Sequence, residues 1–332
     1  MKSLIKSLVE TPGPSGSEQV IREIIRAEIA SVADEIKVDA LGNLIARKGA
    51  RQAGGLKVML SAHMDEIGVM ATHIDDHGFI RFITIGGVHP RTCIGGRVLF
   101  MNNIRGVIYT ERTETPEKYP AIENLYIDVG AKSRADCPVK VGDTAGFDRP
   151  FLDLGDRLVA KSMDNRISAA VLIETMKQVT NTPHELYFVF STQEEVGLRG
   201  ATTAAFGIDP DLGFAVDVTA SGDTPKGIKM EVSLGKGPTI KVRDSSFISD
   251  PRLVRWMVAT ADKLAIPYQL EVLEAGGTDG RAIQLTRAGV PASCVSIPCR
   301  YIHSPSEMVD YQDVQNAVRL LVGLVSQPFL LE

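Results

Sequence analysis

A short apolar segment that ends in two adjacent carboxylates constrains this chain more than any other feature. Residues 186–190 are apolar and rich in aromatic side chains, a composition that favours a strand buried on both faces of a sheet. Glu194 and Glu195 follow this segment, and Gly197 lies two residues beyond them. Acidic side chains resist burial unless they are paired or bind a metal. The segment therefore has two interpretations, a solvated acidic loop or the edge of a functional crevice.

Other apolar segments end in the same way and decide between these interpretations. The polar residues that follow predicted strands or begin a predicted helix are His63, Asp65, Asp164, Asp217 and His303. Taken alone, His63 would be interpreted as structural, and Asp164 as the N-cap of its helix. The repeated strand–helix pattern predicts an α/β sheet, however, and such sheets bind ligands beyond the carboxyl ends of their strands. We therefore expect these residues to share one crevice with the two glutamates.

The stretch from residue 67 to residue 153 has a different character. Glycines are frequent, apolar residues tend to alternate, and no long helical pattern occurs, which is typical of a small β-barrel or sandwich. His73, His77 and His89 lie in it without carboxylates at ligand spacing, and we interpret them as surface or structural residues. The sequence predicts a mixed-sheet α/β domain sandwiched by helices, built from residues 1–66 and 154–332, with an inserted barrel-like β domain at 67–153.

Composition excludes several classes of partner. The net charge is −5 and no basic block occurs, so neither nucleic acid nor an anionic membrane is an expected partner. No apolar run approaches the roughly 20 residues of a membrane span, and no signal-peptide pattern is found. The four cysteines form no Cys-x-x-Cys pair and are expected to be reduced thiols. We expect a cytoplasmic protein.

The chemistry of the predicted crevice points to metal ions. Two imidazoles and several carboxylates without a thiolate suit zinc, cobalt or manganese better than calcium or magnesium. Five ligands are too many for one open catalytic zinc, but they suit two metals about 3.5–4 Å apart that share a bridging carboxylate. Such centres hydrolyse peptide or ester bonds, and a remaining carboxylate acts as general base. A metal-bound imidazole also needs its other nitrogen held, usually by a carboxylate such as Asp65.

The motifs that carry these residues resemble a known family. They are His63-Met64-Asp65, Ser162-Met163-Asp164-Asn165, Gln193-Glu194-Glu195-Val196-Gly197, Val216-Asp217 and Arg300-Tyr301-Ile302-His303-Ser304. In order and context they resemble the M42 family of dinuclear metallo-aminopeptidases, which includes the tetrahedral TET aminopeptidases. The resemblance covers essentially the whole chain, including the inserted β domain and the loop at residues 276–279.

The resemblance implies a ligand set for two divalent metal ions per subunit, with zinc or cobalt expected. Asp164 would bridge the two ions. His63 and Asp217 would complete one site, and Glu195 and His303 would complete the other.

The resemblance also implies the remaining roles and the partners. Glu194 would be the general base, and Asp65 would orient His63. The main domain would be catalytic, and the inserted domain would make contacts between subunits in a dimer or a tetrahedral dodecamer. The implied activity is removal of N-terminal residues from peptides that have a free N-terminus.

Two other functions remain open on the sequence. One is a metal-dependent deacylase or dipeptidase of the same broader clan, against which the sequence around Glu194 and His303 argues. The other is a metal-stabilised assembly without catalysis, which would not need Glu194 as a spare base. The preferred N-terminal residue is not determined. Arg243, Arg281 and Arg300 could favour acidic residues if they faced the pocket, although a surface or salt-bridge role is favoured for each.

Overall fold

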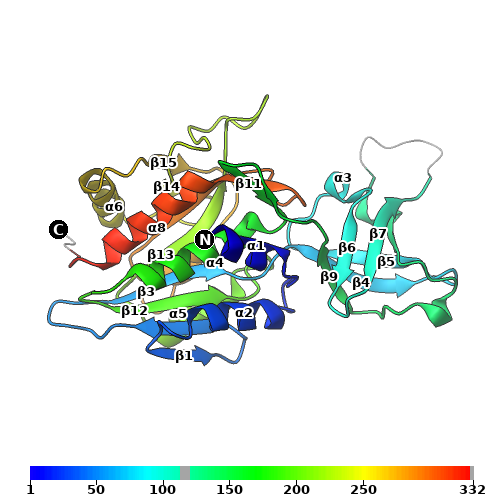
Figure 1. The fold of residues 1–332 in the computed structure, drawn as a ribbon, viewed down its shortest axis with the longest axis horizontal. Helices are drawn as coiled ribbons and strands as arrows, with labels where there is room; N and C mark the ends of the chain where they lie inside the picture. The colour runs from blue at the N-terminus through cyan, green and yellow to red at the C-terminus, as the bar shows by residue number, and fades with distance from the viewer. Residues whose placement is uncertain (113–119, 330–332) are drawn as a thin grey trace.

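The computed structural model describes residues 1–112 and 120–329. Residues 113–119 of the predicted β domain and 330–332 of the predicted main domain lie outside the described residues. The chain forms two bodies, a larger α/β body that contains both ends of the chain and a smaller β body standing to one side of it (Figure 1).

Eleven strands of the described residues form one mixed sheet in the larger body. Four neighbouring strands at its centre run parallel, namely β12 (Glu185–Ser191), β3 (Lys57–His63), β13 (Leu212–Ala220) and β16 (Ala292–Arg300). The other strands are β1 (Glu35–Val38), β2 (Leu44–Lys48), β10 (Leu152–Asp153), β11 (Arg157–Ala160), β14 (Thr239–Arg243), β15 (Gln269–Val272) and β17 (Glu307–Asp310). Because the four central strands are parallel, their carboxyl ends share one edge of the sheet.

Helices cover both faces of this sheet. One face packs against α1 (Lys2–Glu10), α2 (Gln19–Ile29), α4 (Met163–Gln178), α6 (Pro251–Lys263) and α8 (Tyr311–Val325). The other face packs against α5 (Arg199–Ile208) and α7 (Asp279–Gln284). Successive side chains of β3 point to opposite faces of the sheet. Val58 and Leu60 lie in the apolar core on the first face, and Met59 lies in the core on the second face.

The smaller body is a closed six-strand barrel in the order β4-β5-β8-β7-β6-β9. Its strands are β4 (Gly68–Ile74), β5 (Ile80–Ile85), β6 (Arg97–Phe100), β7 (Arg105–Thr110), β8 (Leu125–Asp128) and β9 (Thr144–Phe147), with the short helices α3 (Pro90–Cys93), η1 (Ile122–Asn124) and η2 (Arg134–Asp136). The barrel has its own apolar core, which includes Phe82, Phe100 and Ile127. The predicted fold class, a mixed α/β sheet with an inserted β-barrel, is confirmed.

Two local sequence patterns predict elements that the structure does not have. The alternation at residues 139–143 predicts a strand of the β domain, but these residues form a turn in which the Asp143 amide donates to the Lys140 carbonyl at 3.0 Å. The residues after the glycine-rich loop predict a helix over 282–288, whereas α7 begins at Asp279 and ends at Gln284. The Thr278 hydroxyl caps it by accepting a hydrogen bond from the Gly280 amide.

A buried ion network joins the barrel to the sheet. Glu66, at the start of the insertion, accepts hydrogen bonds from the Gly13 amide at 2.8 Å and from the Lys161 ammonium at 2.5 Å. Arg166 lies 3.9 Å from the same carboxylate, and all three charged side chains are buried. Strand β9 passes close by, since a Cβ on Gly146 would lie 2.7 Å from Glu66 Oε1. The network therefore fixes the barrel strand, the N-terminal loop and the start of α4 together.

Among the described residues, no helix is long and apolar enough to cross a membrane. The four cysteines are unpaired. His73, His77 and His89 are exposed on the barrel, as expected of surface residues.

Candidate active site

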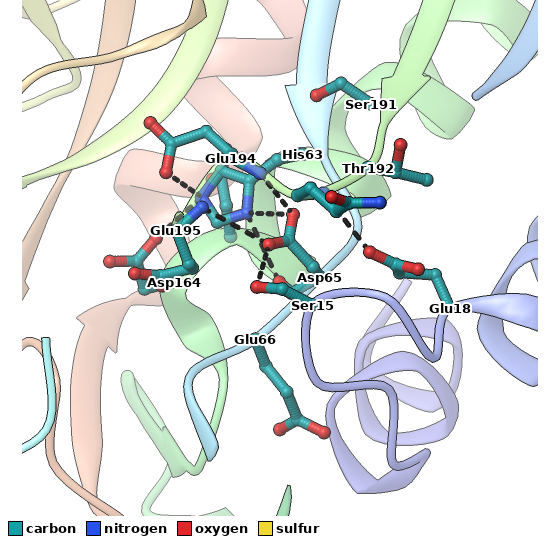
Figure 2. Close-up of polar contacts among 12 residues, drawn as sticks. Ser15, Glu18, His63, Asp65, Glu66, Asp164, Ser191, Thr192, Glu194 and Glu195 are labelled. Atoms are coloured by element: carbon teal, nitrogen blue, oxygen red, sulfur yellow. Dashed lines mark hydrogen bonds and ion pairs between the residues drawn. The ribbon is translucent and has the colours of Figure 1, made fainter. Parts of the chain in front are cut away.

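The parallel centre of the sheet brings the predicted site residues together. His63 ends β3 and pairs in register with Ser191, the last residue of the adjacent strand β12, so Glu194 and Glu195 follow beside it. Asp217 lies in β13, on the other side of β3, and His303 follows β16. Figure 2 shows His63, Asp164, Glu194 and Glu195 converging at this edge.

The ligand atoms form two clusters that share one carboxylate. His63, Asp164 and Asp217 make one cluster, and Asp164, Glu195 and His303 make the other, with ligand atoms within 4.8 Å of one another in each. The His63 Nε2 atom lies 3.1 Å from Asp164 Oδ1, whereas His303 Nε2 lies 3.3 Å from Asp164 Oδ2. The two oxygens of Asp164 therefore face different clusters.

The residues at this edge fit a pair of divalent cations. Four of the five cluster members are buried to about nine-tenths or more, a costly arrangement for carboxylates unless a cation is near. The Glu195 Oε1 atom is buried and has no hydrogen-bond partner, although a buried carboxylate oxygen normally has one. The nitrogen and oxygen donor set suits zinc, cobalt or manganese.

The pKa shifts of the site residues reflect how many carboxylates are buried close together here. Burial, and then the nearby Asp217 carboxylate, raise the pKa of Glu194 well above its usual range. Burial lowers the pKa of His63, but the charge of Glu194 and the hydrogen bond with Asp164 outweigh it and raise the pKa well above its ordinary value. Burial likewise opposes the shift at His303, yet Asp164 and Glu195 raise its pKa to about 11. The site therefore stabilises positive charge strongly.

Asp65 holds more than one neighbour. Its Oδ1 atom lies 3.3 Å from His63 Nδ1 and accepts the Glu194 amide at 3.0 Å. Its Oδ2 atom accepts the Glu195 amide at 3.2 Å and the Ser15 hydroxyl at 2.6 Å (Figure 2). One buried carboxylate thus fixes a histidine of the first cluster and the backbone of both glutamates. Sequence reasoning linked Asp65 to His63 alone.

Glu307 is a site residue that the sequence reasoning missed. Its Oε2 atom accepts the Asp164 amide at 2.9 Å, and its Oε1 atom accepts the His303 amide at 2.8 Å. Asp164 is not the N-cap of α4, because Ser162 holds that position and the Asp164 carboxylate faces His63 and His303 instead. The Glu307 carboxylate therefore supports the backbone of one residue from each of two distant segments. The one available signal was an acidic residue beginning the apolar strand β17.

Asp279 is a second missed residue. It is buried, and its Oδ2 atom accepts the hydroxyls of Ser61 and Ser191 at 2.6 Å each. These serines lie on β3 and β12, the strands that lead to His63 and Glu194. The glycine-rich loop before Asp279 is therefore tied to both strands.

The barrel also reaches the site. Gly86 and Gly87 follow β5, and a Cβ on Gly87 would lie 2.4 Å from His303 Nδ1. A Cβ on Gly86 would lie 3.0 Å from Glu195 Oε2, and its φ of 71° also favours glycine. The insertion carries none of the ligands that the resemblance implies, and these two glycines lie close to Glu195 and His303 of the second cluster.

A cavity of about 480 Å³ opens beside the clusters. Its walls include the end of β13, the loop at residues 273–277, Ile302 and Gly87. The Arg300 guanidinium is bound by Asp223 at 2.9 and 2.7 Å, Arg243 is exposed, and Arg281 lines a separate cavity between α5 and α7. None of these three arginines lines the cavity beside the clusters.

A parallel-centred α/β sheet with two candidate metal clusters and a cavity at its strand ends defines the class of metal-dependent hydrolases. A family model described as M42 glutamyl aminopeptidase matches residues 42–320, and the chain belongs to the M42 peptidase family. The family expected from the sequence motifs is confirmed, and the chain is a hydrolase of the aminopeptidase class.

Relatives match along the whole chain. A putative aminopeptidase of Acetivibrio thermocellus is 49% identical over 327 residues, which covers 98% of each chain. A lysyl aminopeptidase of Pyrococcus furiosus is 38% identical over 341 residues, covering 98% of this chain and 96% of the relative. The solved structure of the Pyrococcus horikoshii TET1 peptidase, described as assembling into a tetrahedron or a large octahedral shell, has a TM-score of 0.90 and 33% identity, with coverage of 98% and 99%.

Proposed function

We propose that this chain is an aminopeptidase that removes N-terminal residues from peptides with the help of two divalent cations, zinc or cobalt being expected. The observation that carries the proposal is the placement of Asp164, whose two carboxylate oxygens face two separate ligand clusters. His63 and Asp217 would hold one ion with Asp164, and Glu195 and His303 would hold the other. Bound there, the ions would polarise the peptide carbonyl and lower the pKa of a water molecule.

Glu194 is the residue that we assign as general base. It lines the cavity, belongs to neither cluster, and has its Oε2 atom 3.8 Å from His63 Nε2. Burial raises the pKa of Glu194 above its ordinary value, the direction in which enzymes shift a carboxylate that acts as general base. Glu194 would take a proton from the attacking water and pass it to the nitrogen of the leaving amine. Asp65 would keep Glu194 in place through its backbone amide.

The deciding experiment compares free and blocked N-termini. The protein is dialysed against a chelator, reloaded with zinc, cobalt or manganese, and assayed on a tripeptide, on its N-acetylated form and on a dipeptide. We expect hydrolysis of the free tripeptide but not of its acetylated form, and only after metal is restored. Preference for the acetylated form would favour a deacylase, and hydrolysis of dipeptides alone would favour a dipeptidase. No hydrolysis with any of the three metals would leave the non-catalytic assembly as the better account.

Glu307 provides a test of the metal sites that does not depend on activity. The Glu307→Gln side chain keeps one acceptor oxygen, so the amide of Asp164 or of His303 then faces an NH₂ group. We expect metal affinity to fall about 10–100-fold, as for other residues that orient metal ligands. Competition with a chromophoric chelator measures this change.

Asp313 offers a matched control for that variant. It is also a buried carboxylate that accepts two backbone amides, those of Gly235 and Gly237, at 2.6 and 2.7 Å. Asp313→Asn should cost a similar stability of about 1–3 kcal/mol in denaturant unfolding while leaving metal affinity unchanged. Equal metal affinity in the two variants would show that Glu307 has a structural role alone.

We also propose that residues 67–153 form an oligomerisation domain on a catalytic domain of residues 1–66 and 154–332. The structure of the TET1 relative supports this, since it is described as a tetrahedron or an octahedral shell. We expect the intact protein to sediment as a large particle, up to a dodecamer. A variant in which a Gly/Ser linker replaces residues 67–153 should sediment as a much smaller species.

The readout of that experiment is particle size rather than activity, because the deletion also removes Gly87, which lies against His303 of the second cluster. If light scattering shows the intact, metal-loaded protein to be monomeric at micromolar concentration, the barrel serves to cover the site and the assembly proposal fails. The cytoplasmic location stays a prediction.

A further inference from the structure

Apart from the histidines of the two clusters, His63 and His303, the cavity beside the clusters has mainly apolar walls. Beyond the cluster residues and Glu194, its lining side chains come mainly from Val218, Thr219, Ala220, Leu273, Ala275 and Ile302. Five of the six are apolar. The hydroxyl of Thr219 already donates to Glu271 Oε1 at 2.8 Å. Among the described residues, no lysine or arginine lines this cavity.

A buried lysine behind the cavity wall is already paired. Lys241 is fully buried and pairs with Glu271, the same carboxylate that holds Thr219. Asp244 lies 3.6 Å from the Lys241 ammonium and is also buried. The Lys241 ammonium thus faces the carboxylates of Glu271 and Asp244. These three side chains, which lie behind Thr219 of the cavity wall, together carry an excess of negative charge. Lys241 is therefore not free to compensate a second anion in the cavity.

We propose that this cavity receives uncharged, apolar N-terminal side chains and rejects acidic ones. The inference rests on the proposed aminopeptidase function and names the substrate class of the same site. A side chain such as Leu or Met would bury its methylene groups against the apolar wall. A Glu side chain against this wall would lose water around its carboxylate, meet no lysine or arginine, and lie near the negative group behind Thr219. This chain would then differ in preference from the glutamyl activity in its family's description.

The first test uses three substrates that differ in the N-terminal side chain. The metal-loaded protein is assayed near pH 7 on the p-nitroanilides of Leu, Gln and Glu, and kcat/KM is compared. Gln and Glu have nearly the same shape, so their ratio isolates the charge. We expect Leu to exceed Glu by at least about 100-fold and Gln to exceed Glu by at least about tenfold, since an unpaired charged group in a binding site is strongly penalised.

The second test adds the missing cation. Ala275 lies in the exposed loop that lines the cavity, so Ala275→Arg is expected to fold normally and to raise the Glu/Gln ratio at least about tenfold. Val272→Arg is the matched control. It adds the same charge at an exposed position of the neighbouring strand, where Val272 lines a different cavity with Ile228 and Leu270. The control should leave the ratio unchanged.

The outcomes separate the two proposals. If none of the three substrates, and no free peptide, is hydrolysed by the metal-loaded protein, the proposed function itself fails. If hydrolysis is observed but Glu matches or exceeds Gln, the function stands and the inference is overturned. The backbone amides of Gly276 and Gly277 would then be the groups to consider as hydrogen-bond donors to the carboxylate of the Glu substrate. Equal effects of the two arginine variants would also overturn it, because the wall at Ala275 would not be contacting the N-terminal side chain.

Discussion

The Glu194→Gln variant is expected to bind metal normally and to lose about 10²–10⁴-fold in kcat. The amide has the shape of the carboxylate but cannot accept a proton, and loss of a general base typically costs this factor. Glu194 belongs to neither ligand cluster, so metal content should not change. Its backbone amide still donates to Asp65, so the turn that carries it should keep its position. The measurements are kcat on a free tripeptide and the metal content per chain after dialysis.

A matched substitution separates loss of the base from a general effect of removing a glutamate. Glu185 lies on the same strand β12 at its opposite end, where it accepts the Tyr187 hydroxyl at 3.0 Å. Glu185→Gln should keep both the parent rate and the parent metal content. If Glu194→Gln hydrolyses the peptide as fast as the parent, another group takes the proton. If it loses metal instead, Glu194 is a ligand.

The parts of the site that sequence could predict are those that follow strands. His63 and the Glu194–Glu195 pair come directly after apolar segments, and the parallel order of β3 and β12 places such positions side by side. The family motifs then assigned roles to individual residues. The inserted β domain was predictable as a small barrel or sandwich, because alternating apolar residues and frequent glycines persist over its whole length.

The supporting residues could not be predicted because their partners are distant or lie in the backbone. Asp279 binds Ser61 across 218 positions of sequence, and although the loop at residues 276–279 belongs to the family resemblance, nothing in it identifies Ser61 as the partner of Asp279. Glu307 binds two backbone amides, which any residue except proline could offer. The contact of Gly87 with His303 depends on how the barrel stands against the sheet, and neither domain's own pattern contains that information.

Particular contacts also decide questions that residue types leave open. Arg300 could have favoured acidic substrates, but its guanidinium already donates two hydrogen bonds to the Asp223 carboxylate. Lys241 is close to the cavity wall, but Glu271 engages it. The preference that we propose for the N-terminal residue therefore rests on which charges are already paired, and pairing is a property of the folded chain.

The Asp164→Ala variant is expected to lose both metal ions and to lose activity by at least about 10³-fold. Each cluster contains Asp164, and each of its oxygens faces a different histidine, His63 or His303. Removing the carboxylate leaves two ligands in each cluster, fewer than the three protein ligands typical of a catalytic zinc site. The ions supply several kcal/mol of transition-state stabilisation, and each 1.36 kcal/mol corresponds to tenfold in rate. Metal content after dialysis, measured by mass spectrometry, is the primary readout.

His303→Ala is the control for metal loss in the Asp164→Ala variant. His303 belongs to the second cluster alone, so its loss should weaken mainly the ion shared with Glu195 and leave the His63–Asp217 side occupied. Asp164→Ala should therefore retain less metal than His303→Ala under identical dialysis. Retention of one ion by Asp164→Ala would contradict the bridging role and would mean that one cluster binds its ion without Asp164. Unfolding in denaturant, followed for both variants without metal, distinguishes loss of ligands from loss of the fold.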